Sequence, residues 1–220
     1  MDSPLFLRGL LIGFAIAAPV GPIGLLCIRR SLSGGFAPGF ATGLGAAAAD
    51  GLYGAVAAFG LTAVSSFLVA QQGWLRLGGG IALMALGLSI ALKRPAQPGD
   101  GARAIGADNG ANAIGADGLA GAFASTFLLT VANPATILSF VAIFAGLGVS
   151  AGGGASGAWG AALVVLGVFL GSAAWWLFLA WISAALRRQF PPSAMRWINR
   201  ASGAAIAAFG AIAVASFFAG

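Results

Sequence analysis

Six long stretches of apolar residues, separated by short polar connections, divide the chain. Each stretch is long enough as a helix, at about 1.5 Å per residue, to cross about 30 Å of hydrocarbon. Charged residues gather where the stretches end, which is typical of helices that leave a bilayer. The pattern predicts an all-α polytopic membrane protein with six transmembrane helices, over residues 5–28, 37–64, 74–92, 119–147, 158–186 and 195–218.

Proline interrupts two of these predicted helices, the first at Pro19-Val20-Gly21-Pro22 and the fourth at Asn133-Pro134. Proline removes a backbone donor and clashes with the preceding turn, so both helices should be broken there. In lipid, a break is tolerated only where the freed backbone groups are buried or line a cavity. A packing kink is the alternative, but two breaks favour a substrate-binding site built from Pro19, Gly21, Pro22, Asn133 and Pro134.

The chain also divides into two halves of similar outline. Residues 1–92 and 119–220 each contain three predicted helices, and the first helix of each half is broken. Residues 93–118 are rich in Pro, Gly, Ala, Asp and Asn, which is typical of a flexible linker. Because each half has an odd number of helices, the second half must enter the membrane from the opposite side. The sequence therefore predicts two inverted three-helix repeats, whose breaks face each other across a transport pathway.

Composition excludes several classes of protein. With 60% hydrophobic residues, 7% charged residues and a mean hydropathy of +0.98, the chain is not a soluble domain. It contains no His and no Glu, and Cys27 is its only cysteine. Most groups for acid–base, metal or nucleophilic chemistry are therefore missing. We expect no enzyme activity, no cofactor and no metal site.

The net charge of +6 comes from arginines at segment ends rather than from one contiguous face. This distribution indicates membrane orientation and not nucleic-acid binding. Arg29-Arg30 closes the first predicted helix, and with Lys93, Arg94 and other basic residues it belongs to the odd-numbered connections. The positive-inside rule then predicts a cytoplasmic linker, with both termini on the periplasmic side of a bacterial inner membrane.

Asp50 is the one acidic residue inside a predicted span. A carboxylate at the centre of a membrane helix costs about 2.5–3.5 kcal/mol, so Asp50 should face the bundle interior. We interpret it as a proton-coupling group or a partner for a substrate ammonium; a structural partner for an arginine or a backbone N–H is the alternative. Tyr53, one turn further, is a candidate substrate-binding residue. Small helical neighbours should let another helix approach Asp50 closely: Gly39, Gly43, Ala46, Gly54 and Ala57.

Three motifs carry a resemblance to a known family. The run Gly13-Phe14 through Pro19-Val20-Gly21-Pro22, the run Gly43 to Tyr53 that includes Asp50, and Asn133-Pro134 together resemble the LysE/RhtB-type amino-acid exporters, the LysE-type translocators. The six-helix pattern and the linker in mid-chain fit the same family. The resemblance implies export of amino acids or related small metabolites, driven by the proton motive force.

We therefore expect a secondary transporter that exports amino acids or related small metabolites by alternating access around the paired breaks, with Asp50 coupling transport to protons. A heavy-metal exporter of the same superfamily is disfavoured because soft ligands are scarce. A passive channel, and a membrane scaffold or assembly subunit without transport activity, remain alternatives. The expected partners are the solute, protons and the lipid bilayer, and the glycine-rich helix faces are compatible with a homodimer.

Overall fold

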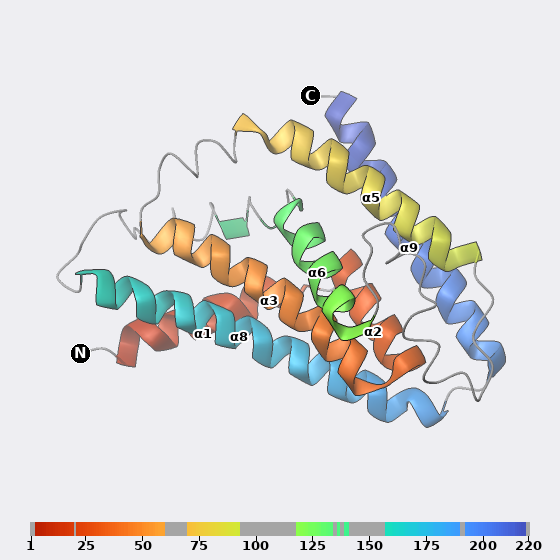
Figure 1. Cartoon of the computed structure of the whole chain (residues 1–220), viewed down its shortest axis with the longest axis horizontal. Coiled ribbons are helices and arrows are strands. Elements are labelled where there is room, and N and C mark those ends of the chain that lie inside the picture. Colours follow the sequence, from red (N-terminus) through yellow and green to blue (C-terminus); the bar gives the residue numbers. More distant parts are fainter. Residues whose placement is uncertain are drawn as a thin grey trace.

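The computed structural model consists of helices, and the residues that it describes contain no strand. These residues are 3–19, 21–59, 70–92, 118–133, 136, 139–140, 157–189 and 192–218. Figure 1 shows their arrangement, with a short 3₁₀ turn, η2 (Arg187–Gln189), between the last two helices. In chain order the α-helices are α1 (Ser3–Ala17), α2 (Pro22–Gly34), α3 (Phe36–Ala58), α5 (Gln72–Leu92), α6 (Gly118–Val131), α8 (Gly157–Leu186) and α9 (Pro192–Phe218).

Three helices are each long and apolar enough to cross a membrane, namely α5, α8 and the Trp197–Phe218 part of α9. Taken together, α1 and α2 are a fourth candidate span, bent by 82° at the break between them. Apolar helices long enough to cross a membrane thus lie where the third, fifth and sixth were predicted, and a break lies at the place predicted in the first. The predicted second helix corresponds to α3, which with 23 residues is long enough to cross a membrane. Its glycines and Asp50 lower its hydropathy, so it is not among the candidate spans. Most of the predicted fourth helix beyond α6 lies outside the described residues.

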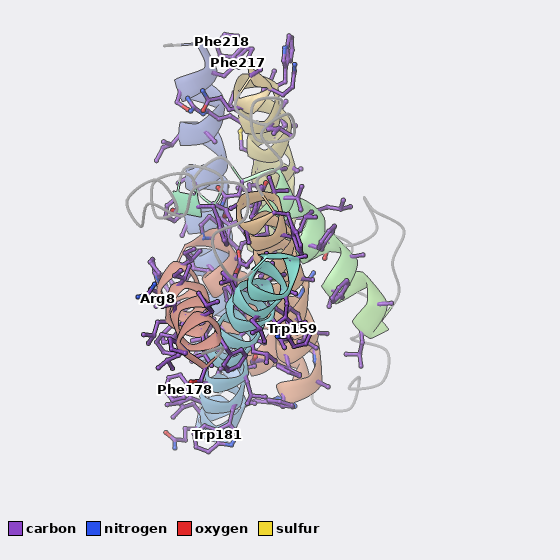
Figure 2. All side chains as sticks on the ribbon, turned by 90° about the vertical axis from the view of Figure 1, so that its left-hand side faces the viewer. Arg8, Trp159, Phe178, Trp181, Phe217 and Phe218 are labelled. Carbon is purple, nitrogen blue, oxygen red and sulfur yellow. The ribbon has the colours of Figure 1, made fainter. Side chains whose placement is uncertain are left out.

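Apolar side chains cover the outside of the molecule, while many polar side chains lie inside. In Figure 2, Trp159, Phe178 and Trp181 of α8 and Phe218 of α9 point outward, and all four are exposed. This distribution reverses that of a soluble protein and is the one that a bilayer favours. The buried polar and charged side chains include Arg29, Arg30, Ser31, Thr42, Asp50, Ser125, Thr126, Thr130, Ser172, Ser183, Asn199 and Ser202.

Two pairs of helices run side by side in the same direction. Gly9 and Gly13 of α1 lie against the backbone of Val164 and Val168 of α8, with no room for a side chain between them. The two contacts ascend together in both helices, so α1 and α8 are parallel. Similarly, Gly45 of α3 lies against Phe123 of α6, and eight residues further along both helices Tyr53 of α3 bonds to Val131 of α6. Hence α3 and α6 are also parallel.

Glycine contacts show that α3 and α8 are antiparallel. A Cβ at Gly43, near the start of α3, would overlap the side chain of Trp176, whereas one at Gly54, near its end, would lie 3.3 Å from Val168. Later residues of α3 therefore meet earlier residues of α8, so the two helices run in opposite directions. Because α8 also packs on α1, and α3 on α6, these four helices form one connected layer in Figure 1.

The long helices α5 and α9 form a second antiparallel pair, beside this layer (Figure 1). Two glycine pairs make the contact, Gly80 with Gly210 and Gly87 with Gly203, and the backbones touch at both. A Cβ at Gly203 would lie 2.6 Å from the carbonyl oxygen of Gly87, well inside van der Waals distance. Small residues at corresponding positions let two membrane helices approach closely without a polar bond.

One expectation about the arginines is wrong. Arg29 and Arg30 do not close the first span within a connection, because α2 continues past them to Gly34 and buries both side chains. The sequence pattern misled because an arginine pair after an apolar run is also what a cytoplasmic helix end looks like. Here the guanidinium groups instead turn inward toward polar side chains of neighbouring helices.

Candidate functional site

The first break separates α1, which ends at Ala17, from α2, which begins at Pro22. Pro22 is the first residue of α2, where a missing backbone N–H breaks no hydrogen bond. Gly21 precedes it in an extended conformation, and no side chain caps the first turn. Among the residues that the structure describes, a Cβ built at Gly21 would meet no atom within 4 Å, and Pro19 is exposed.

The second predicted break begins where α6 ends, at Val131. The backbone then turns, because the Asn133 N–H donates to the Thr130 carbonyl at 3.1 Å and the Thr136 N–H donates to the Asn133 carbonyl at 3.1 Å. Both bonds span three residues rather than the four of an α-helix. Asn133 is half-buried at this turn, whereas Pro134 lies outside the described residues.

Asp50 is buried between α3 and α8. The Ser172 hydroxyl of α8 donates to its Oδ2 at 2.6 Å, and Trp176 Nε1, one turn further along α8, donates to the same Ser172 oxygen at 3.1 Å. The Ser172 hydroxyl thus donates its proton to the carboxyl group and accepts the indole N–H with a lone pair. Asp50 is only 3% exposed, so this relay is enclosed by protein.

The small residues around Asp50 make this bond possible. Gly51 and Gly54 of α3 face Phe169 and Val168 of α8, and Cβ atoms built there would already touch those side chains. With larger residues the helices would be held further apart, beyond direct reach of a serine hydroxyl. The predicted close approach of another helix to Asp50 is thus present, and that helix is α8.

Tyr53 points from α3 toward α6. Its hydroxyl donates a hydrogen bond to the carbonyl of Val131, the last residue of α6, and its ring packs on Phe140 with centroids 5.5 Å apart. Carbonyl groups in the last turn of a helix have no partner within that helix. Tyr53 therefore supplies a donor at the point where α6 ends.

Asp50 lies at the level of the first break. Ala17 and Ile23, on either side of the break, belong to the same buried cluster as Ala46 and Ala47, one turn before Asp50. The preceding turn of α1 packs on the cluster of Tyr53 and Val168, just beyond Asp50. Gly9 and Gly13 of α1 meet Val164 and Val168 of α8, and the same register places Ala17, at the end of α1, level with Ser172 and hence with Asp50. Tyr53 and Asn133 are linked through the end of α6, so the described site residues form one neighbourhood around α3.

Comparison with known proteins identifies the family. The sequence pattern of the LysE type translocators matches residues 14–216, which is nearly the whole chain. The chain belongs to this family. It is also 33% identical, over 142 residues, to a protein of Bacillus subtilis (strain 168) named "Putative amino acid efflux protein YcgF". That match covers 64% of this chain and 62% of the Bacillus protein, less than two thirds of its length. No solved structure matches the chain.

Several polar residues of this translocator were missed or misread in the sequence. Ser172 and Trp176 carried a usable signal, since a serine and a tryptophan four residues apart in an apolar helix share one face. Trp176 lies in the main buried cluster, and the Trp175 ring meets Phe14 edge-on at 5.4 Å. Arg30 gave no such signal, because its partners lie on two other helices, at Thr42 of α3 and, 96 residues away, at Thr126 of α6.

Proposed function

We propose that this LysE-family translocator is a secondary transporter that exports amino acids or related small metabolites across the bacterial inner membrane, and that Asp50 couples export to protons. The observation that carries the proposal is the buried Asp50 carboxyl group beside the broken helix α1–α2. An ionisable side chain inside a membrane bundle is costly and marks ion or proton pathways in transporters. Its bond to Ser172 joins the two halves of the chain at that level.

Two inverted repeats would supply the alternating access that such an exporter needs. Under this proposal α1 with α2 corresponds to the segment that begins with α6, α3 to α8, and α5 to α9. If each helix is replaced by its counterpart in the other half, the contact between α1 and α8 becomes a contact between α6 and α3. Both contacts are present in the structure. Corresponding helices should also run in opposite directions. The antiparallel pairs α3·α8 and α5·α9 support this, and so does α1, which is parallel to α8 and hence opposed to α6.

The breaks suit a zwitterionic solute. At the first break, the N-terminus of α2 presents backbone N–H groups, while the C-terminus of α1 presents carbonyl groups. An amino acid carries a carboxylate for the first and an ammonium for the second. We assign substrate binding to Pro19, Gly21 and Pro22 at this break, and to Tyr53 with Asn133 and Pro134 at the other.

Purified protein in lipid vesicles tests this proposal. Cells that express the chain are first challenged with toxic concentrations of aliphatic, basic and aromatic amino acids, and the protected class is then used as a radiolabelled substrate. An imposed pH gradient should drive its transport against a concentration gradient by the wild type. Asp50→Asn should abolish this pH-dependent component, because an amide cannot take up and release a proton near neutral pH.

Asp117→Asn is the matched control, since it makes the same chemical change in the stretch between the two halves, outside the described residues. It should transport like the wild type. Uphill, pH-dependent transport by Asp50→Asn at the wild-type rate would exclude Asp50 as the coupling group. A wild-type protein that moves no amino acid of any class would contradict the exporter function itself.

A further inference from the structure

Two adjacent arginines are buried near one end of the bundle. Arg29 and Arg30 are each 5% exposed and lie in α2, about one turn before it ends at Gly34. At the same end α8 also ends and α3, α6 and α9 begin, as their pair directions require; we call this the arginine end. Burying a guanidinium group inside a membrane protein is costly, so a role beyond packing is needed to explain the pair.

Arg30 joins the two halves of the chain. Its Nη1 donates to Thr42 Oγ1 of α3 at 2.9 Å and to Thr126 Oγ1 of α6 at 3.2 Å. The same Nη1 also reaches the Ala122 carbonyl oxygen of α6 at 3.2 Å, and Nη2 donates to Ser125 Oγ at 3.2 Å. The guanidinium group thus lies between helices of the first half and the second and third turns of α6.

The hydroxyl groups around Arg30 are oriented to accept. Thr42, Ser125 and Thr126 each donate their own proton to a backbone carbonyl four residues earlier in their helix, at 2.6–2.8 Å. Their lone pairs are therefore left for the guanidinium N–H groups. The three hydroxyl oxygens are thus fixed as acceptors by their own helices, independently of Arg30.

Arg29 makes a second bond between the halves. Its Nε donates to Asn199 Oδ1 of α9 at 3.3 Å, and Asn199 is itself buried. Successive residues point about 100° apart around a helix, so adjacent arginines reach two different helices. Through them, α2 is tied to both α6 and α9 at the same level.

We propose that Arg29 and Arg30 form a latch between the two halves, which holds the arginine end closed and releases when that end opens to the solute. This inference depends on the proposed alternating-access transport. Guanidinium, hydroxyl and amide groups all bond well to water, so water can replace every bond of the latch in the open state. An apolar seal of similar size would instead expose hydrophobic surface on opening. Polar bonds therefore suit a contact that must break and re-form in each cycle.

Cys27 provides a native reporter for this movement. It is the only cysteine of the chain, is completely buried, and lies one turn before Arg30 on the same side of α2. Its thiol donates to the Gly39 carbonyl of α3 at 3.4 Å, and Gly39 lies directly against Ser31 of α2. Because α2 and α3 pack so closely there, they should move together. Cys27 shares its buried cluster with Leu129 of α6 and Ile206 of α9, so departure of these two helices would open the cluster and expose the thiol.

The experiment measures the rate at which N-ethylmaleimide alkylates Cys27 in lipid vesicles, by mass spectrometry. Arg30→Gln and the nearly isosteric Thr126→Val should each raise this rate by about tenfold or more, which corresponds to about 1.4 kcal/mol in favour of the open form. Arg76→Gln is the matched control, because Arg76 also joins the halves, through the Ser216 carbonyl at 3.4 Å, but at the opposite end. It should leave the alkylation rate unchanged, and Cys27→Ser should abolish labelling.

Gel filtration and thermal unfolding identify the variants that remain folded. If Arg30→Gln does not fold, the pair Thr126→Val and Ser125→Ala decides the question, since both keep the buried charge. Wild-type alkylation rates in these folded variants would overturn the latch, as would an equal increase in Arg76→Gln. The readout does not require transport. Latch-dependent labelling in a protein without solute flux would therefore contradict the exporter and not the latch.

Discussion

The hydrogen bond between Ser172 and Asp50 provides the sharpest test of how the carboxyl group is held. The Ser172 hydroxyl donates to Asp50 Oδ2 at 2.6 Å, and this bond is charge-assisted when the carboxyl group has released its proton. Such bonds contribute about 1.5–3 kcal/mol to stability, whereas bonds between neutral groups contribute about 0.5–1.5 kcal/mol. Ser172→Ala also leaves the Trp176 N–H without its acceptor, which adds about 1–3 kcal/mol for a buried donor.

A double-mutant cycle separates these two effects. In the Asp50→Asn background an amide carbonyl can still accept from Ser172, but without the charge. The Trp176 contribution is the same in both backgrounds and cancels. We therefore expect Ser172→Ala to cost about 1 kcal/mol more in the wild type than in Asp50→Asn, the difference between a charged and a neutral bond.

The free energy of unfolding is measured by titrating SDS into mixed micelles, with far-UV circular dichroism as the signal. Ser89→Ala is the control, because the Ser89 hydroxyl donates only to the Leu86 carbonyl of its own helix, at 2.7 Å. It should change stability by less than about 0.5 kcal/mol and show no coupling to Asp50. Equal costs of Ser172→Ala in both backgrounds would refute the view that Asp50 is held as a charged acceptor.

Two further substitutions test the packing around the site. Tyr53→Phe removes the donor to the Val131 carbonyl and should lower the free energy of unfolding by about 1–3 kcal/mol; an unchanged thermal midpoint would show that water replaces the hydroxyl. Gly203→Ala drives a Cβ into the backbone of α5 at Gly87 and should cost about 1–3 kcal/mol in the same titration. Gly78→Ala, where a Cβ meets nothing within 4 Å, should be neutral or slightly stabilising. Equal effects at both glycines would mean that α5 and α9 do not touch as described.

Local chemistry made part of the site predictable. Pro22 alone predicts a break between α1 and α2, because a proline has no backbone N–H with which to continue the hydrogen bonding of a helix. The burial of Asp50 followed in the same way, from the cost of exposing a carboxylate to lipid and from its small neighbours. Both inferences need only residues that are close together in the chain.

The partners of these residues were not predictable. Ser172 lies 122 residues from Asp50, and the Arg30 acceptors on α6 lie more than 90 residues away. Serine and threonine occur throughout apolar helices, so their presence does not reveal which one meets a charge. The burial of Arg29 and Arg30 was not predictable either, because hydropathy alone cannot distinguish an arginine at a membrane surface from one that turns inward.

The sequence by itself determined the class of this protein, its apolar helices and the position of the first break, because these depend on backbone geometry and on transfer of side chains between water and lipid. Only the tertiary structure decided that Asp50 meets Ser172, that Tyr53 closes the end of α6, and that two arginines join the halves. Such bonds depend on which helix faces cross and how closely glycines let them approach. That information belongs to pairs of helices and not to any single stretch of the chain.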